Sequence, residues 1–505
     1  MTVKPPTPDQ LLDVADDLGL SLSDADVDEF REMIAETLAS YYAPLDRMPD
    51  HLPKVTYPRT LGHRPGADED PSRAWAIKAS VRGAARGRLI GKRIVLKDNI
   101  CLAGVPMMNG STTLEGFVPE IDATVVTRIL DQGGEIVGKA HCEEFCASGS
   151  SHNNPYGPIH NPHKAGYTTG GSSSGCAYLV AAGEVDMAIG GDQAGSIREP
   201  AAFSGICGMK PTYGLVPYTG VFPIELTLDH IGPMTATTAD NALLLEVIAG
   251  ADGLDPRQYA PLTAPYTEAL SGGVESLRIG VLEEGFGQEK SEPDVDAKVH
   301  AAAQVLRELG ATVEDVSIPM HSLSIALWVV VATEGSIATM MRGNGFGTNW
   351  RGLYLTSLLD RHAAWRSRID EVNTGFKIRL VMAEYLARAY RGRYYAKAQN
   401  LSRKLKAAYD EAFERFDLLL LPTSAIKATR LPGPNASLSE AMAPGLDPVT
   451  NTAAFNLTGH PALSIPCAMS AGLPVGLQLV ARYYDEATIY RASQAFEEAT
   501  DWKSL

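Results

Sequence analysis

Two short loops and one lysine carry the side chains with the most evident chemistry. The first loop, Gly170–Gly175, contains three consecutive serines, and the second, Gly191–Arg198, contains Ser196. Lys97 follows the apolar run 94–96, which is typical of a buried strand. A serine hydroxyl is a weak nucleophile and needs a base; lysine can serve when it is neutral, and burial favours the neutral amine. This ordered set predicts acyl-transfer chemistry on serine.

Both loops also offer backbone N–H groups to an anion. The glycines before Ser173 form a turn at a predicted helix N-terminus, where free amides favour negative charge. In the second loop the small residues Ala194 and Gly195 let consecutive amides converge beside the hydroxyl of Ser196, as an oxyanion hole requires. A phosphate cradle is the alternative for the first loop. The Walker pattern needs a lysine after its last glycine, however, and here Cys176 stands there.

Two other interpretations of these residues stay open. The run 171–175 also fits a nucleophile elbow with Ser173 as nucleophile and His460 as base. No HGGG-like oxyanion segment accompanies it, and His460 lies in a Thr-Gly-His-Pro sequence typical of a turn. We therefore expect Ser173 to support the site by hydrogen bonding. Taken alone, Lys97 would more simply form a salt bridge with the neighbouring Asp98.

The elements that must position these residues alternate between strand and helix. Strands are predicted at 93–96, 135–138 and 187–190, and helices at 123–132 and 173–182, which favours an α/β sheet covered by helices. A second strand–helix–strand stretch follows at 277–318, long helices extend to 416, and late strands at 418–421, 462–466 and 474–481 return to the first sheet. The predicted divisions are an N-terminal helical region and linker (1–88), a first core segment (89–265), an inserted smaller lobe (266–440) and a C-terminal core segment (441–505).

The N-terminal region has clear helix signals. Thr7 precedes Pro8, a pairing that favours a helix start, and Ser23 can cap a second helix. That second helix has an apolar stripe at helical spacing, so it is expected to pack on the main body or on another subunit; the stripe consists of Val27, Phe30, Ile34, Leu38 and Tyr41. Prolines among polar residues from 42 to 91 predict a linker with short helical pieces.

Composition excludes several classes of protein. The 505 residues are 45% hydrophobic and 21% charged, which is ordinary for a globular enzyme, and the net charge of −16 argues against a nucleic-acid partner. Without a signal peptide or an apolar run of membrane-span length, and with six scattered cysteines, a cytoplasmic protein is expected. The spacing within the one cysteine and histidine cluster matches no usual zinc pattern, so neither metal nor cofactor is expected; this cluster is Cys142, Cys146, His152, His160 and His163.

Residues 170–217 resemble the signature of the amidase signature family, from Gly-Gly-Ser-Ser through Asp-Gln-Ala-Gly-Ser-Ile-Arg to Lys-Pro-Thr-Tyr-Gly-Leu-Val-Pro. Further segments, including Val-Pro-Met-Met-Asn-Gly-Ser at 105–111 and Thr-Gly-Val-Phe-Pro-Ile-Glu at 219–225, are similar to the nitrile-pathway amidases of actinobacteria within that family. The resemblance covers essentially the whole chain. It implies the amidase-signature fold, with a mixed central sheet that helices cover on both faces.

The resemblance also implies roles for individual residues. Ser196 would be the nucleophile, and Ser172, on a non-proline cis peptide, would relay its proton towards Lys97. Backbone amides of Gln193, Ala194, Gly195 and Ser196 would form the oxyanion hole. An acyl-enzyme ester would then be hydrolysed through the same relay. A homodimer through the N-terminal helices follows from their apolar face together with the resemblance.

Some residues depart from the family pattern or surround the expected site. Ala194 and Ser174 stand where glycine is common, and Glu199 stands where an apolar residue is usual. Asp192 and Arg198 are expected to hold the loop through charge-assisted bonds, with a direct substrate role as the alternative. Candidates for an apolar acyl pocket, of which Met108 and Phe145 are favoured, are Met107, Met108, Phe145, Ile224 and Trp328.

Together these features predict a hydrolase that converts small carboxylic amides, aryl or branched aliphatic, to the acid and ammonia. An aryl-acylamide, ester or carbamate hydrolase with the same triad is the nearest alternative, because acyl-enzyme chemistry accepts different leaving groups. An alternative from another class is an amidotransferase subunit that generates ammonia from glutamine.

Overall fold

The computed structural model describes residues 3–505, and the chain forms two compact units, Met1–Lys54 and Val55–Leu505. The first unit contains α1 (Pro8–Asp17) and α2 (Asp24–Thr37). Both predicted helix starts are confirmed: Thr7 accepts a hydrogen bond from Gln10 N and Ser23 accepts one from Asp26 N. Within this unit the buried apolar side chains are Leu11, Ala15 and Val27.

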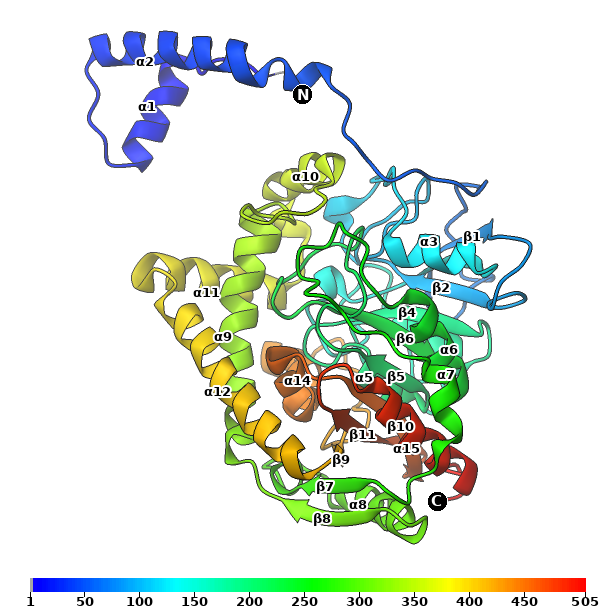
Figure 1. The fold of residues 1–505 in the computed structure, drawn as a ribbon. Coiled ribbons are helices and arrows are strands. Elements are labelled where there is room, and N and C mark those ends of the chain that lie inside the picture. The colour runs from blue at the N-terminus through cyan, green and yellow to red at the C-terminus, as the bar shows by residue number, and fades with distance from the viewer. Residues whose placement is uncertain (1–2) are drawn as a thin grey trace. The chain divides into compact units, whose positions relative to one another are not determined.

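The second unit is built on one mixed sheet (Figure 1) in the order β1-β3-β2-β4-β6-β5-β10-β11-β9-β7-β8. Neighbouring strands are parallel from β3 through β2 to β4 and from β9 through β7 to β8, and antiparallel elsewhere. The predicted mixed central sheet is confirmed. Its strands are β1 (Trp75–Arg82), β2 (Arg93–Lys97), β3 (Glu135–Ala140), β4 (Met187–Asp192), β5 (Cys207–Lys210), β6 (His230–Thr235), β7 (Arg278–Leu282), β8 (Thr312–Val316), β9 (Leu418–Pro422), β10 (Ala462–Ser470) and β11 (Leu473–Ala481).

Both faces of this sheet are covered by helices, as expected. In β2, Ile94 and Leu96 belong to one apolar cluster and Val95 to another, because successive side chains of a strand point to opposite faces. Helices α3 (Thr124–Asp131), α6 (Thr238–Ile248), α8 (Pro293–Glu308) and α15 (Glu486–Ala499) pack on the Ile94 face. The opposite face is covered by α4 (Ser174–Ala181), α5 (Arg198–Ser204), α12 (Arg393–Arg415) and α14 (Ala453–Thr458).

The remaining helices of the second unit lie mostly in the segment between β8 and β10. They are α7 (Tyr266–Ala269), α9 (Ser324–Ser336), α10 (Thr356–His362), α11 (Thr374–Tyr390) and α13 (Leu438–Leu446). Helix α9 packs against α11, α12 and α14. The predicted lobe 266–440 thus contributes these helices, but its strands β7, β8 and β9 belong to the same sheet as the core. The predicted division stays a prediction.

Three strands differ from the sequence expectation. Strand β1 lies within the predicted linker 42–91 and pairs antiparallel with β3 at the edge of the sheet. The sequence analysis includes no strand at the positions of β5 and β6, which contain Gly208, Gly232 and Pro233. Glycine and proline weaken the local strand signal, whereas here the neighbouring strands β4 and β10 supply the pairing.

One long apolar helix also corrects the sequence analysis. The helical stretch Pro319–Arg342, which includes α9, is 24 residues long, and its most apolar 18-residue window has a mean hydropathy of 1.6, enough by length and composition to cross a membrane. The expectation that no apolar run approaches that length is wrong here. Because 56% of its most apolar window is buried inside the protein, the run is accounted for by core packing against other helices.

Candidate active site

Lys97 ends β2 and is fully buried on the face that α4 covers. Its Nζ donates to Ser172 Oγ at 2.7 Å and to the carbonyl oxygen of Gly191 at 3.1 Å. Within residues 3–505 no carboxylate forms an ion pair with Lys97, because the neighbouring Asp98 pairs with Lys139 at 3.2 Å. The salt-bridge alternative for Lys97 is therefore wrong. Burial without a carboxylate partner favours the neutral amine, the form in which lysine can serve as a base.

The serine-rich turn joins Lys97 to the second loop. The peptide bond between Gly171 and Ser172 is cis, as the resemblance implied. Ser173 Oγ donates to the carbonyl oxygen of Gly191 at 3.2 Å and accepts from its N–H at 3.3 Å. The expected supporting role of Ser173 is thus seen in its contacts, and one residue, Gly191, receives hydrogen bonds from both Lys97 and Ser173.

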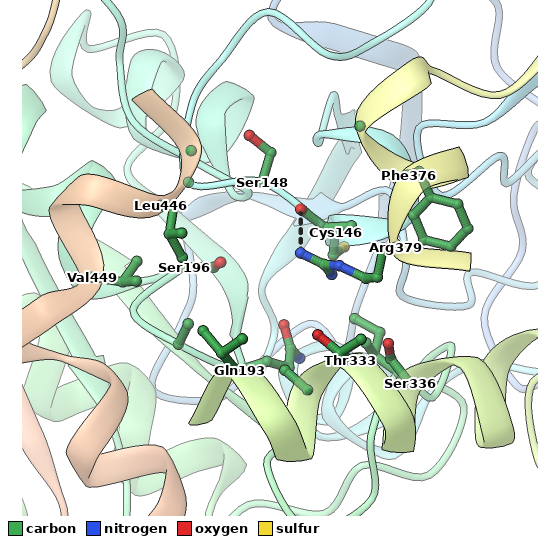
Figure 2. Close-up of a pocket in the computed structure, with 18 of the residues that line it drawn as sticks. Cys146, Ser148, Gln193, Ser196, Thr333, Ser336, Phe376, Arg379, Leu446 and Val449 are labelled. Carbon is green, nitrogen blue, oxygen red and sulfur yellow. Dashed lines mark hydrogen bonds between the residues drawn. The ribbon is translucent and has the colours of Figure 1, made fainter. Parts of the chain in front are cut away.

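The second loop connects β4 to α5 and presents Ser196 to a cavity (Figure 2). Gly195 has φ of +149°, and a Cβ there would lie 2.4 Å from Thr452 Oγ1, so the loop requires glycine at this position. Ala194 keeps a negative φ, since it is absent from the positive-φ conformations of the described chain. Within residues 3–505 the backbone N–H groups of 193–196 have no hydrogen-bond acceptor. Four consecutive unpaired donors can stabilise an oxyanion.

A buried ion pair fixes both ends of this loop. The guanidinium of Arg198 donates to both carboxylate oxygens of Asp192 at 3.0 and 2.9 Å, and both side chains are fully buried. Arg198 also donates to Thr452 O, Gln478 Oε1 and Asn456 Oδ1. Burial alone would raise the pKa of Asp192, but the charge and hydrogen bonds of Arg198 lower it. These contacts match the structural role expected for the pair, and neither residue lines the cavity.

The cavity beside Ser196 has a volume of about 200 Å³. Ile224 and Trp328 line it, and Trp328 Nε1 donates to the carbonyl oxygen of Gln193 at 2.7 Å. Met108 and Phe145, the favoured pocket residues, do not line it. Phe145 is fully buried behind Phe376, with ring centroids 5.0 Å apart, while Met108 Sδ accepts hydrogen bonds from Arg64 and Tyr156.

Several cavity residues carried no recognisable sequence signal. Phe376 and Arg379 come from α11, and Leu446 and Val449 come from α13 and the turn after it. None of these belongs to a glycine-rich or serine-rich loop, and periodicity alone marks them only as helical. Cys146 also lines the cavity and was expected only as part of a weak metal cluster.

The other candidate residues have separate partners. His460 contacts Thr458 Oγ1 at 2.9 Å and Asp410 Oδ1 at 3.0 Å, whereas Ser173 is bonded to Gly191, so the nucleophile elbow is not formed. Among residues 3–505 no three histidine, cysteine, aspartate or glutamate side chains form a group that could hold a metal.

Two buried carboxyl groups lie beneath the serine-rich turn. Glu199 is fully buried, and within residues 3–505 no side chain donates a hydrogen bond to its carboxyl oxygens. Burial, followed by the nearby charges of Asp192 and Glu143, raises the pKa of Glu199 well above its usual range. Burial likewise raises the pKa of Glu143 to about 8. A fully buried carboxyl group with a raised pKa favours its neutral form, which is compatible with the apolar residue that the resemblance implies at this position.

Replacing Glu199 by glutamine should make stability less dependent on pH. The pKa of Glu199 is higher in the folded than in the unfolded protein. Its contribution to the free energy of unfolding is therefore complete below the unfolded-state pKa and is lost as the pH rises through the folded-state pKa. Between these two pKa values, the free energy of unfolding of the variant should rise relative to that of the wild type by up to about 1.4 kcal/mol per pH unit. Urea unfolding between about pH 5 and pH 9 measures this difference. Parallel stability curves for the two proteins would contradict the expectation.

Comparison with known proteins identifies the family. The model of the family described as Amidase matches residues 67–490. An enantioselective amidase from Rhodococcus rhodochrous is 41% identical over 99% of this chain and 96% of its own length. The chain therefore belongs to the amidase family, and the resemblance to amidase signature enzymes is confirmed. It is an amide-hydrolysing enzyme.

Other relatives show how wide this family is. One subunit of the glutamyl-tRNA(Gln) amidotransferase from Lysinibacillus sphaericus is 40% identical over 83% of this chain and 84% of its own. The crystal structure of the corresponding amidotransferase chain from Thermotoga maritima matches with a TM-score of 0.71 at 30% identity, covering 86% of this chain and 89% of that one. A bacterial aryl acylamidase structure matches with a TM-score of 0.70 at 25% identity over 86% and 91% of the two chains.

Proposed function

We propose that this enzyme hydrolyses carboxylic amides through a triad of Ser196, Ser172 and Lys97. The observation that carries the proposal is the 2.7 Å contact between Lys97 Nζ and Ser172 Oγ, together with the position of Ser196 in the wall of the cavity. In its neutral form the Lys97 amine accepts the proton of Ser172, and Ser172 in turn accepts that of Ser196. Ser196 Oγ attacks the amide carbonyl carbon, and the unpaired N–H groups of 193–196 stabilise the oxyanion.

Collapse of the tetrahedral intermediate breaks the C–N bond. The proton held by the relay passes to the leaving nitrogen, so that ammonia departs and an ester remains on Ser196. A water molecule then attacks this ester while the same relay takes its proton, which releases the carboxylic acid and restores Ser196. Each residue of the triad thus acts in both halves of the reaction.

Trapping the ester tests this mechanism. Acid quenching during turnover of an activated ester such as p-nitrophenyl acetate should leave one acetyl group on the protein, and peptide mass spectrometry should locate it on Ser196. Label on Ser173 or on Cys146 would overturn the assignment. A panel of amides, anilides, esters and carbamates, ranked by kcat/KM, separates the primary-amide hydrolase from the aryl-acylamide, ester and carbamate alternatives. Ammonia release from glutamine only with an added partner would favour the amidotransferase alternative.

The N-terminal unit supports a further proposal, that the enzyme is a homodimer. This unit leaves many large apolar side chains exposed, and a second copy could cover them; these include Leu12, Val14, Leu18, Phe30, Met33 and Tyr41. Residues 1–66 also lie outside the matched family model, as expected of a segment with a role besides catalysis. A cytoplasmic location is proposed as well, because the six free, buried cysteines fit a reducing compartment.

Removal of residues 1–54 should convert the dimer to a monomer. The remaining chain forms its own compact unit with the complete sheet, so we expect it to fold and to keep amidase activity. Light scattering coupled to size-exclusion chromatography measures the mass of both proteins. A truncated chain that stays dimeric, or a full chain that is monomeric, would contradict the proposal.

A further inference from the structure

Arg379 places a positive charge in the same cavity as Ser196. It lies on α11, and Figure 2 shows its side chain extended into this cavity. Its Nη2 donates to the carbonyl oxygen of Ala147 at 3.3 Å, and this is its one hydrogen bond within residues 3–505. A guanidinium carries five N–H donors, so most of its donor capacity is unused.

No acidic side chain in the described part of the chain forms an ion pair with Arg379. The cavity is lined by two carboxylates, Glu144 and Glu225, and both have other partners. Glu144 accepts from Ser111 Oγ at 2.8 Å and from two donors of Asn373 at 2.8 and 2.7 Å. Burial raises its pKa. Neither this carboxylate nor Glu225 compensates the guanidinium.

Glu225 is held in the same way. It accepts from Thr227 N at 2.8 Å, from Thr227 Oγ1 at 2.6 Å and from Tyr395 OH at 2.8 Å. Burial raises its pKa too. The cavity therefore presents one cation whose charge is not neutralised, and desolvating such a cation is costly unless an anion arrives. Burial alone lowers the pKa of Arg379, yet arginine stays protonated in proteins.

We infer that Arg379 binds a carboxylate of the substrate, so that this enzyme acts on amides that also carry a free carboxylate. This inference rests on the proposed function. A guanidinium matches a carboxylate with two parallel hydrogen bonds, which gives orientation as well as affinity. The substrate would place its amide at Ser196 and its carboxylate at Arg379, and hydrolysis would yield a dicarboxylate and ammonia.

The rest of the cavity defines the part of the substrate between these two groups. The lining is mostly apolar, which suits a chain of methylene groups or a ring; it includes Ile224, Leu228, Trp328, Phe376, Leu446 and Val449. Because Glu144 and Glu225 are committed to protein donors, no carboxylate in the described lining is available for an ammonium group. A substrate with an α-amino group beside its carboxylate should therefore bind less well than the same molecule without it.

Matched substrates test the inference. Succinamate, glutaramate and adipamate are compared with butyramide, valeramide and hexanamide, in which a methyl group replaces the carboxylate. The carboxylate-bearing amide that is hydrolysed best should have a kcat/KM about 10- to 100-fold above that of the neutral amide of the same length. Glutaramate should also exceed L-glutamine, which differs from it by the α-amino group. Equal or better hydrolysis of the neutral amides by the wild type would overturn the inference while leaving the proposed amide hydrolysis intact.

Variants of Arg379 separate recognition from folding. Arg379→Gln should raise KM for the carboxylate substrates and lower their kcat/KM by about 10- to 100-fold, while valeramide stays within about threefold. Arg379→Lys should lose less activity than Arg379→Gln, because lysine keeps the positive charge but cannot form two parallel hydrogen bonds with a carboxylate. Arg388→Gln is the matched control, since Arg388 lies on the same helix with its side chain 84% exposed. Equal losses on charged and neutral substrates would show a structural role and overturn the inference.

A binding measurement keeps the inference testable without turnover. Calorimetry with the Ser196→Ala variant should detect glutaramate, and the added Arg379→Gln change should weaken that binding about 10-fold or more. Unchanged binding in the double variant, or no binding in either, would overturn the carboxylate assignment. If glutaramate binds as expected and yet no amide is hydrolysed by the wild type, the proposed function fails and the binding site stands.

Discussion

Replacement of Ser196 by alanine should lower kcat for amide hydrolysis by about 10⁴- to 10⁶-fold, the loss seen when a serine nucleophile is removed. The change deletes one oxygen from a side chain that lines the cavity and has no hydrogen bond of its own within residues 3–505. The fold and the binding of substrate should therefore persist. Ammonia release under saturating substrate measures kcat, and calorimetric binding of the substrate shows that the cavity is intact.

Ser174 provides the matched control for this variant. It belongs to the same serine-rich run, it is fully buried, and its hydroxyl has no hydrogen-bond partner in the described part of the chain. Because a buried unpaired hydroxyl costs free energy, Ser174→Ala should leave kcat within about threefold and leave stability equal or higher. If Ser196→Ala kept a tenth of the activity, or if both variants lost it equally, Ser196 would not be the nucleophile.

The sequence predicted which loops and which lysine form the candidate site because these residues lie in short local motifs. Lys97 follows an unbroken apolar run, and the two loops end or begin regular elements, so their geometry depends on nearby residues. The fully buried position of Lys97 and the role of Ser173 between the loops follow from the same local pattern. The Asp192–Arg198 pair could be foreseen because a charged pair flanking a buried loop needs mutual compensation.

The cavity wall and the weak strands could not be predicted in the same way. Trp328, Phe376 and Arg379 come from long helices far along the chain, and their meeting with Ser196 depends on tertiary packing. Met108 and Phe145 lie close in sequence to the family motifs, yet nearness in sequence did not bring them into the wall. Strands β5 and β6 were missed because their glycines and proline are tolerated only through pairing with distant strands.

Replacement of Lys97 by methionine should lower kcat by about 10²- to 10⁴-fold, the usual contribution of a general base. The same change should leave the free energy of unfolding equal or increase it by about 1–2 kcal/mol, because a buried amine without a carboxylate partner is costly. The carbonyl oxygen of Gly191 keeps the hydrogen bond from Ser173 when Lys97 is lost. Activity and stability are thus expected to change in opposite directions, as at many sites built for catalysis.

Lys139→Met is the control that distinguishes a base from a structural lysine. Lys139 is also fully buried, but it pairs with Asp98, whose pKa burial already raises. Its removal leaves Asp98 buried without its cation and should destabilise the protein by about 3 kcal/mol. Urea unfolding and kcat of both variants give the comparison. If Lys97→Met destabilised the protein as much as Lys139→Met, or kept activity within about tenfold of the wild type, Lys97 would be a structural residue and not the base.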